Sequence, residues 1–228
     1  MNENWQATHS SAREICRLFE LPDSFLEDLL QGDDWTYIIR LHALLETAIT
    51  WALEIHLQPH PIGDFLARLN FAGRGSSKLE LAEQLGILDQ DSRKYVSGIN
   101  TIRNRLAHNI RHLRFDLARY VEDLSEEHRR QFVSNCCALV DPKIAADTLK
   151  EERVSNIPAP KLILWAEGIL VVATILEKTR LKLPPPESGG PSQASLQQIV
   201  DSIFGMTARM RAADSRRSLD AKIANLVP

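Results

Sequence analysis

Apolar residues recur at every third or fourth position through much of this chain, the spacing that gathers them on one face of an α-helix. The clearest example follows the Asp33-Asp34 pair, which can cap a helix that begins near Trp35. Its apolar positions are Ile38, Leu41, Leu45, Ala48, Ala52 and Ile55. Proline cannot continue a helix, so the pattern predicts one long helix that ends before Pro59.

Four further helices follow from the same spacing. The first covers Lys78 to Leu85 and stops at Gly86, a residue suited to a left-handed cap. The second opens at Asp89 and Asp91, because acidic residues favour a first helical turn. Its apolar stripe is Tyr95, Ile99, Ile102, Leu106, Ile110 and Leu113.

The last two predicted helices cover Ser125 to Leu139 and Leu162 to Leu181. The second of them is the most apolar segment of the chain and follows Pro158 and Pro160, so we expect it at the centre of the core. No stretch alternates between apolar and polar residues as a strand does. The sequence therefore predicts an all-α fold, a helical bundle.

A proline- and glycine-rich stretch divides the chain. Residues 184–192 form a linker, which separates a helical domain over residues 1–183 from a C-terminal arm over residues 193–228. The arm has apolar residues at helical spacing: Leu196, Ile199, Ile203, Met206 and Met210. This repeat is too short to indicate a coiled coil, so we expect the arm to be a helical extension that docks on its own domain or on a protein partner.

Composition indicates a globular protein of a reducing compartment. The 228 residues, 44% of them hydrophobic, suffice for a sizeable core. The three cysteines form no CxxC pattern and argue against a disulfide framework. The N-terminus lacks the basic and apolar regions of a signal peptide. The longest uncharged apolar run, Gly168 to Leu176, is too short to cross a bilayer. We therefore expect a cytoplasmic protein with no membrane partner.

Charge is unevenly distributed along the chain. The formal net charge of −3 predicts no affinity of the whole chain for nucleic acid. Between residues 93 and 114, however, every charged residue is basic. These residues are Arg93, Lys94, Arg103, Arg105, Arg111 and Arg114. A basic stripe of this kind suits a phosphate; a solvated face that pairs with the acidic segment from Glu20 to Glu54 explains it equally well.

One segment inside this basic stripe, Arg103 to His108, is chemically suggestive. Its sequence RNRLAH matches the Arg-x4–6-His signature of the HEPN superfamily of helical RNA-processing proteins. Upstream, PIGDFLARLNFAGRGSSKLELAEQLGILDQD followed by INTIRNRLAHN resembles the branch of that superfamily named for the mannitol operon repressor. The resemblance covers Trp35 to His112, under half of the chain.

The resemblance implies a homodimer in which two copies of the motif face each other across a cleft. RNA would be cleaved there without a metal, with His108 as general base or acid and Arg103 gripping the phosphate. Asn104 would position the phosphate or orient His108. We assign further RNA contacts to Arg105, Arg111 and His112. Arg105 and His112 also fit an Arg-x6-His spacing, a competing register in the same helix.

Helix geometry sets a condition on this site. Asn104 and His108 are four residues apart and share one face, opposite the apolar stripe. Arg103 lies ~140° around an unbroken helix from His108. Its long side chain must therefore wrap around the helix, or the helix must distort, before the two groups can meet.

Structural roles for the same residues stay open at this point. Glu46 lies with His42 on the polar side of the long helix around residue 45, and Arg103 can form a buried ion pair with it. Asn104 and His108 can hydrogen-bond across a helix interface. The chain would then be a catalytically silent transcriptional or defence-related regulator that acts through protein contacts.

Metal and cofactor sites are not expected. His108 and His112 have the spacing of two zinc ligands, but the sequence shows no third ligand. The glycine-containing segment from Phe71 to Ser77 lacks the Lys-Ser/Thr of a phosphate-binding loop, which favours a flexible connection.

Overall fold

The computed structural model describes residues 15–73, 75–108, 113–136, 153–154 and 157–182 of the chain. These residues are helical apart from their connections and one short antiparallel pairing. In that pairing Arg153 lies opposite Pro158, and Val154 lies opposite Ile157. The predicted all-α class is confirmed. The predicted linker over residues 184–192 and the arm over residues 193–228 lie outside the described residues.

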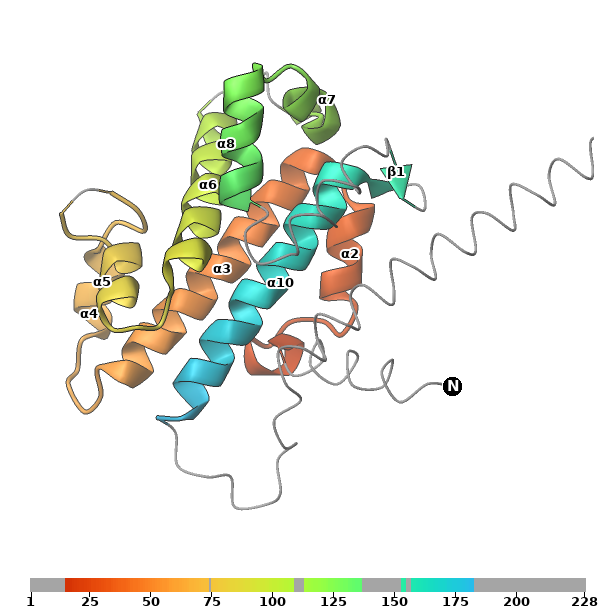
Figure 1. Cartoon of the computed structure of the whole chain (residues 1–228). Coiled ribbons are helices and arrows are strands. Elements are labelled where there is room, and N and C mark those ends of the chain that lie inside the picture. Colours follow the sequence, from red (N-terminus) through yellow and green to blue (C-terminus); the bar gives the residue numbers. More distant parts are fainter. Residues whose placement is uncertain (1–14, 74, 109–112, 137–152, 155–156, 183–228) are drawn as a thin grey trace, which may run out of the picture.

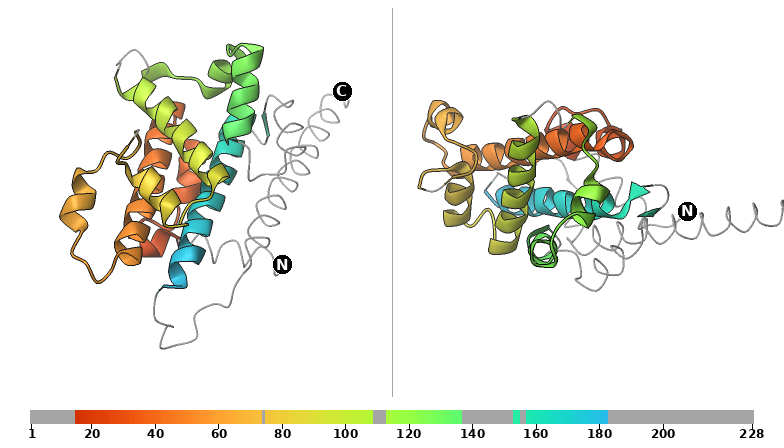
Figure 2. Two further views of the ribbon diagram at one scale, coloured as in Figure 1. Left: turned by 60° about the vertical axis from the view of Figure 1, so that its left-hand side comes forward. Right: turned by 90° about the horizontal axis from the view of Figure 1, so that it is seen from above.

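The described elements, in chain order, are α2 (Phe25–Gln31), α3 (Asp34–His56), α4 (Gly63–Arg68), α5 (Lys78–Gln84), α6 (Gln90–Ala107), α7 (Leu117–Glu122), α8 (Glu126–Cys136), β1 (Arg153–Val154), β2 (Ile157–Pro158) and α10 (Ala159–Arg180). The long helices α3 and α10 pack side by side (Figures 1 and 2). Helix α6 packs against both of them and against α8. Helix α5 contacts α3 and α6, close to the start of α6.

Side-chain caps fix where the central helices begin. Asp33 accepts a hydrogen bond from the Thr36 amide at 2.9 Å, and Asp89 accepts one from the Ser92 amide at 2.8 Å. Each cap of this type contributes ~1 kcal/mol to helix stability. Gly86 follows α5 with a φ of +73°, a conformation that favours glycine. The predicted starts of α3 and α6 and the predicted extent of α5 are confirmed.

Two predicted boundaries differ from the structure. Helix α10 begins at Ala159, so Pro160 lies within its first turn, where a missing amide hydrogen is tolerated. Helix α6 ends at Ala107, and the stripe predicted to continue through Ile110 and Leu113 is therefore wrong at Leu113, which is exposed. Ile110 lies outside the described residues. The short helices α2, α4 and α7 were not predicted, because six or seven residues are too few to show a helical period.

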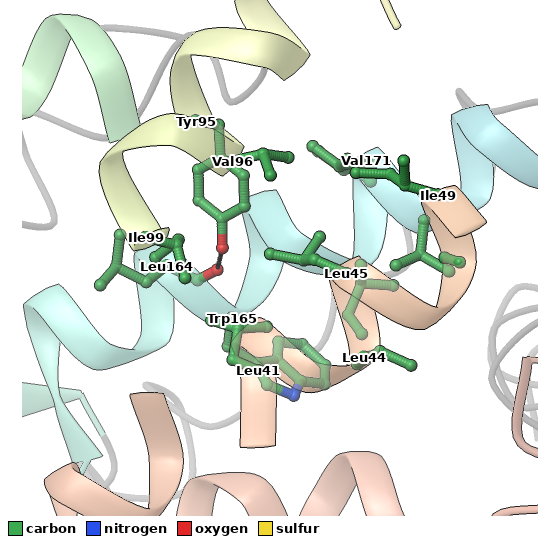
Figure 3. Packing of buried hydrophobic residues seen from close by; sticks show 14 of the residues in the cluster. Leu41, Leu44, Leu45, Ile49, Tyr95, Val96, Ile99, Leu164, Trp165 and Val171 are labelled. Atoms are coloured by element: carbon green, nitrogen blue, oxygen red, sulfur yellow. Dashed lines mark hydrogen bonds between the residues drawn. The ribbon is translucent and has the colours of Figure 1, made fainter. Parts of the chain in front are cut away.

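Helix α10 runs through the core and is buried around nearly its whole circumference. It is the one described helix long and apolar enough to cross a bilayer, but 89% of its apolar window is buried against the rest of the fold. Burial in the core accounts for its composition. Figure 3 shows Leu41 and Leu45 of α3 packed beside α10, and the Tyr95 hydroxyl of α6 donating a hydrogen bond to the Leu164 carbonyl.

Gly168 allows α10 to approach its neighbours closely. A Cβ atom at this position would lie 2.8 Å from Leu41 Cδ1 and 2.9 Å from the Tyr95 hydroxyl oxygen. We expect Gly168→Ala to lower the free energy of unfolding by ~1–3 kcal/mol, the usual cost of overpacking a core. Urea denaturation measures this change. Gly63→Ala is the control, because a Cβ there meets nothing within 4 Å. Equal stability of Gly168→Ala and the unmodified protein would contradict the described packing.

Candidate functional site

The suggestive segment forms the C-terminal turn of α6. The apolar side of this helix is buried and fixes the rotation of the helix about its axis; its residues are Tyr95, Val96, Ile99, Ile102 and, within the segment itself, Leu106. Arg103 and Asn104 are half-buried, whereas His108 is exposed and caps the helix C-terminus. The motif therefore lies at the surface, at the point where the helical backbone stops.

The Arg103 side chain contacts Asn104, and the contacts of the described residues include none between its guanidinium and His108. Helix α6 is unbroken through Ala107, so the side chain rather than the backbone must close the gap. Arg103 Nη1 donates a hydrogen bond to Asn104 Oδ1 at 3.0 Å. The guanidinium is thus turned toward the neighbour that shares its helical face with His108. The His108 side chain makes no hydrogen bond to the residues that the structure describes.

Arg103 does not pair with Glu46. The Glu46 carboxylate instead lies 3.4 Å from Lys78 Nζ of α5 and 3.9 Å from His42 Nδ1. Lys78 Nζ also donates to Thr50 Oγ1 at 3.1 Å. The buried ion pair considered for Arg103 is therefore replaced by a Glu46–Lys78 pair, which leaves the Arg103 guanidinium to Asn104.

A buried histidine lies behind the candidate site. His42 was expected on the polar side of α3, but its residue is only 4% exposed. Its Nε2 lies 3.1 Å from Asn100 Oδ1, and its ring packs edge-on against Phe71 at a centroid distance of 4.8 Å. The segment before α5 and the helix α6 cover this side of α3. A histidine of α3 and an asparagine of α6, one turn before Asn104, thus form an interhelical contact that the sequence analysis missed.

The pKa of His42 is lowered, first because burial disfavours the imidazolium and also because Arg103 is a nearby cation. The unfolded chain therefore takes up protons before the native state does, and stability should fall as the pH drops below ~6.5. We expect His42→Gln to reduce this slope, measured as the free energy of unfolding between pH 7.5 and pH 5. The pKa of His56 is also lowered by burial, and His56 adds the same pH dependence to the unmodified protein and to His42→Gln. An unchanged slope in His42→Gln would contradict this assignment.

The other predicted contacts are only partly described. Arg105 is exposed, and its guanidinium lies 5.3 Å from the centre of the Tyr120 ring of α7. Arg111 and His112 lie outside the described residues, so the competing Arg105/His112 register is seen at Arg105 alone. Among the described residues, no group of three His, Cys, Asp or Glu side chains is arranged to hold a metal ion.

The segment from Phe71 to Ser77, which the sequence predicted as a flexible connection, is tied to its surroundings at both ends. Phe71 is buried against His42, and Ser77 accepts a hydrogen bond from the Glu80 amide and caps α5. The Lys78 amide donates to the Asn70 carbonyl at 3.0 Å. Through Phe71, this segment covers the contact between His42 and Asn100 of α6.

Fold and site together define an all-α protein with an Arg-Asn pair and an exposed histidine at the end of a central helix. Comparison with family models, with curated proteins and with solved structures gives no match for this chain.

Proposed function

We propose that this chain is an RNA-directed, HEPN-like protein that binds a phosphate of RNA at Arg103, Asn104 and His108 and, as a homodimer, cleaves the strand without a metal. The observation that carries the proposal is the hydrogen bond from Arg103 to Asn104. It turns the side chain of the half-buried Arg103 toward the helical face that also carries the exposed His108. The resemblance of RNRLAH to the HEPN signature supports the same assignment.

The electrostatic surroundings of the three residues favour an anion. No carboxylate occurs in the sequence between residues 92 and 115, and Glu46 is engaged by Lys78. A guanidinium binds two phosphate oxygens through its planar fork and stays charged throughout. Because Arg103 is already oriented by Asn104, little side-chain entropy is lost when a phosphate binds.

Cleavage requires two proton transfers. A histidine base takes the proton of the ribose 2′-hydroxyl as the 2′-oxygen forms a bond to phosphorus. A histidine acid gives a proton to the 5′-oxygen as its bond to phosphorus breaks. The products are a 2′,3′-cyclic phosphate and a 5′-hydroxyl. One histidine cannot serve both roles at once, so two facing copies of His108 fit the chemistry.

A binding measurement tests the proposal. Fluorescence anisotropy of a labelled single-stranded RNA should show binding by the full chain, and Arg103→Ala should weaken it by at least about tenfold, the loss of one charge-assisted contact. Arg68→Ala is the matched control, because Arg68 is an exposed arginine of α4. Binding with no cleavage in the presence of a chelator would restrict the function to RNA binding. No binding at micromolar protein would overturn the proposal and favour the regulator that acts through protein contacts.

The proposal also predicts the assembly state. We expect a homodimer that buries part of the Asn104 and His108 face, with an interface of ~1,200–2,000 Å² if it is stable. Sedimentation velocity across a range of micromolar concentrations should give the mass of two 25.7 kDa chains. Arg105→Glu, which introduces an acid beside this face, should shift the protein toward the monomer. A monomer mass at every concentration would contradict the two-histidine mechanism.

A further inference from the structure

A polar cleft lies along α6 on the side that faces α8. Its volume is about 380 Å³, and its lining consists of Gln90, Arg93, Lys94, Ser97, Gly98, Thr101 and Asn135. Helix α8 packs closely at Gly98, where a Cβ atom would lie 3.0 Å from Cys136 Sγ. The cleft thus runs along α6 from Gln90 to Thr101, and the last turn of the same helix carries the candidate site.

The lining of the cleft suits an anion that accepts hydrogen bonds. It contains two cations, hydroxyl groups and amides, and no carboxylate. Arg93 pairs with Glu83 at 3.1 Å, and Lys94 pairs with Asp91 at 2.9 Å. Both pairs are partly exposed to solvent, and surface ion pairs of this kind are weak. A phosphate can therefore displace the carboxylate from Arg93 or Lys94, or share the cation with it.

The cleft and the candidate site lie on one line along the helix. Lys94, Thr101 and His108 are spaced seven residues apart, so successive members differ by only about 20° around the helix axis. At 1.5 Å per residue, the line from Lys94 to His108 is about 21 Å long. A stacked strand that advances ~3.4 Å per nucleotide covers this length with on the order of six nucleotides.

We propose that the cleft binds the sugar-phosphate backbone of the same single-stranded RNA whose scissile phosphate lies at Arg103 and His108, an inference that rests on the proposed function. A single row of cations and hydroxyls matches one strand. The lining has no aromatic side chain on which a base could stack, so the contact is independent of sequence. Affinity should therefore increase with RNA length until the strand reaches the cleft.

A charge change in the cleft tests this proposal. The full chain is titrated by anisotropy with labelled oligouridines of ~2 and ~10 nucleotides. The shorter RNA does not cover the roughly three nucleotides between His108 and Thr101, and the longer RNA exceeds the six-nucleotide span. Thr101→Glu places an acid in the cleft, and Thr101→Gln is the uncharged control of the same shape. We expect Thr101→Glu to weaken binding of the longer RNA about tenfold, by loss of a charge-assisted contact, and to leave the shorter RNA unaffected. Thr101→Gln should bind both RNAs as the unmodified protein does.

A second pair of variants checks the cation. Lys94→Gln should weaken binding of the longer RNA and leave binding of the shorter RNA unchanged. Arg130→Gln should not weaken binding of the longer RNA, although Arg130 forms a similar pair with a carboxylate three residues away, Glu127 at 3.0 Å. Melting temperatures confirm that each variant is folded.

The outcomes separate the two proposals. If Thr101→Glu and Lys94→Gln bind the longer RNA as the unmodified protein does while Arg103→Ala does not, the cleft has no role and the proposed function stands. If Thr101→Glu weakened binding of both RNAs equally, the proposal that the cleft is a separate subsite would also be overturned. If the unmodified protein binds neither RNA, both proposals fail.

Discussion

Replacement of His108 by alanine should reduce RNA cleavage by ~10²–10⁴-fold, the usual loss when a general acid or base is removed. Arg103→Ala should also be severe. Arg103→Lys should restore activity only in part, because an ammonium is a point charge and cannot reproduce the planar fork of a guanidinium. The measurement is single-turnover cleavage of a labelled RNA in the presence of a chelator, with the 2′,3′-cyclic phosphate product identified by mass spectrometry.

Two controls make the His108 result specific. His60→Ala removes another exposed histidine, from the connection between α3 and α4, and should leave cleavage unchanged. His112→Ala should matter much less than His108→Ala. A larger effect at His112 would show that Arg105 and His112 form the true register. Full cleavage by a folded His108→Ala protein would remove this histidine from the mechanism.

Substitution of Asp34 by asparagine should lower the free energy of unfolding by ~3–5 kcal/mol, the cost of leaving a buried charge without its partner. Lys161 Nζ lies 3.0 Å from Asp34 Oδ1, with side-chain exposures of 4% and 14%. The ammonium also donates to the Gly32 carbonyl and lies 5.2 Å from the centre of the Tyr37 ring. These contacts join the start of α10 to the start of α3. Urea denaturation measures the loss.

The double variant Asp34→Asn/Lys161→Met separates the ion pair from other effects. Removal of both charges leaves no uncompensated ion in the core, so part of the lost stability should return. Asp123→Asn is the surface control, because the Arg119–Asp123 pair is exposed and its atoms are 3.8 Å apart. It should barely change stability. If Asp34→Asn were no more destabilising than Asp123→Asn, the buried pair would not hold α10 to α3.

The helical core could be predicted because local chemistry and periodicity agree in it. The capping aspartates at 33 and 89 accept amide hydrogen bonds from the residues three positions later, as caps do. The apolar stripe of α3 is buried from Ile38 through Ala52. The prediction failed at Leu113 because an apolar period cannot show where a backbone leaves the helix.

The surroundings of the site could be predicted only in part. Spacing placed Asn104 and His108 on one face and required Arg103 to wrap, but it could not show that Asn104 would be the acceptor. The burial of His42 depends on Phe71 and on Asn100, which come from two other segments. When residues from other segments bury a polar residue such as His42, the apolar spacing of its own helix does not indicate that burial. The cleft between α6 and α8 was missed for the same reason, because its lining belongs to two helices.

The most direct test of the central claim is to locate bound RNA by the NMR chemical-shift changes of ¹⁵N-labelled protein. The Asn104 side-chain amide gives its own signals, and it lies beside the guanidinium that is proposed to hold the phosphate. We predict that a single-stranded RNA shifts these signals together with the backbone amides of residues 103–108. Shifts confined to other parts of the chain, with the Asn104 signals unchanged at saturating RNA, would contradict the proposed site.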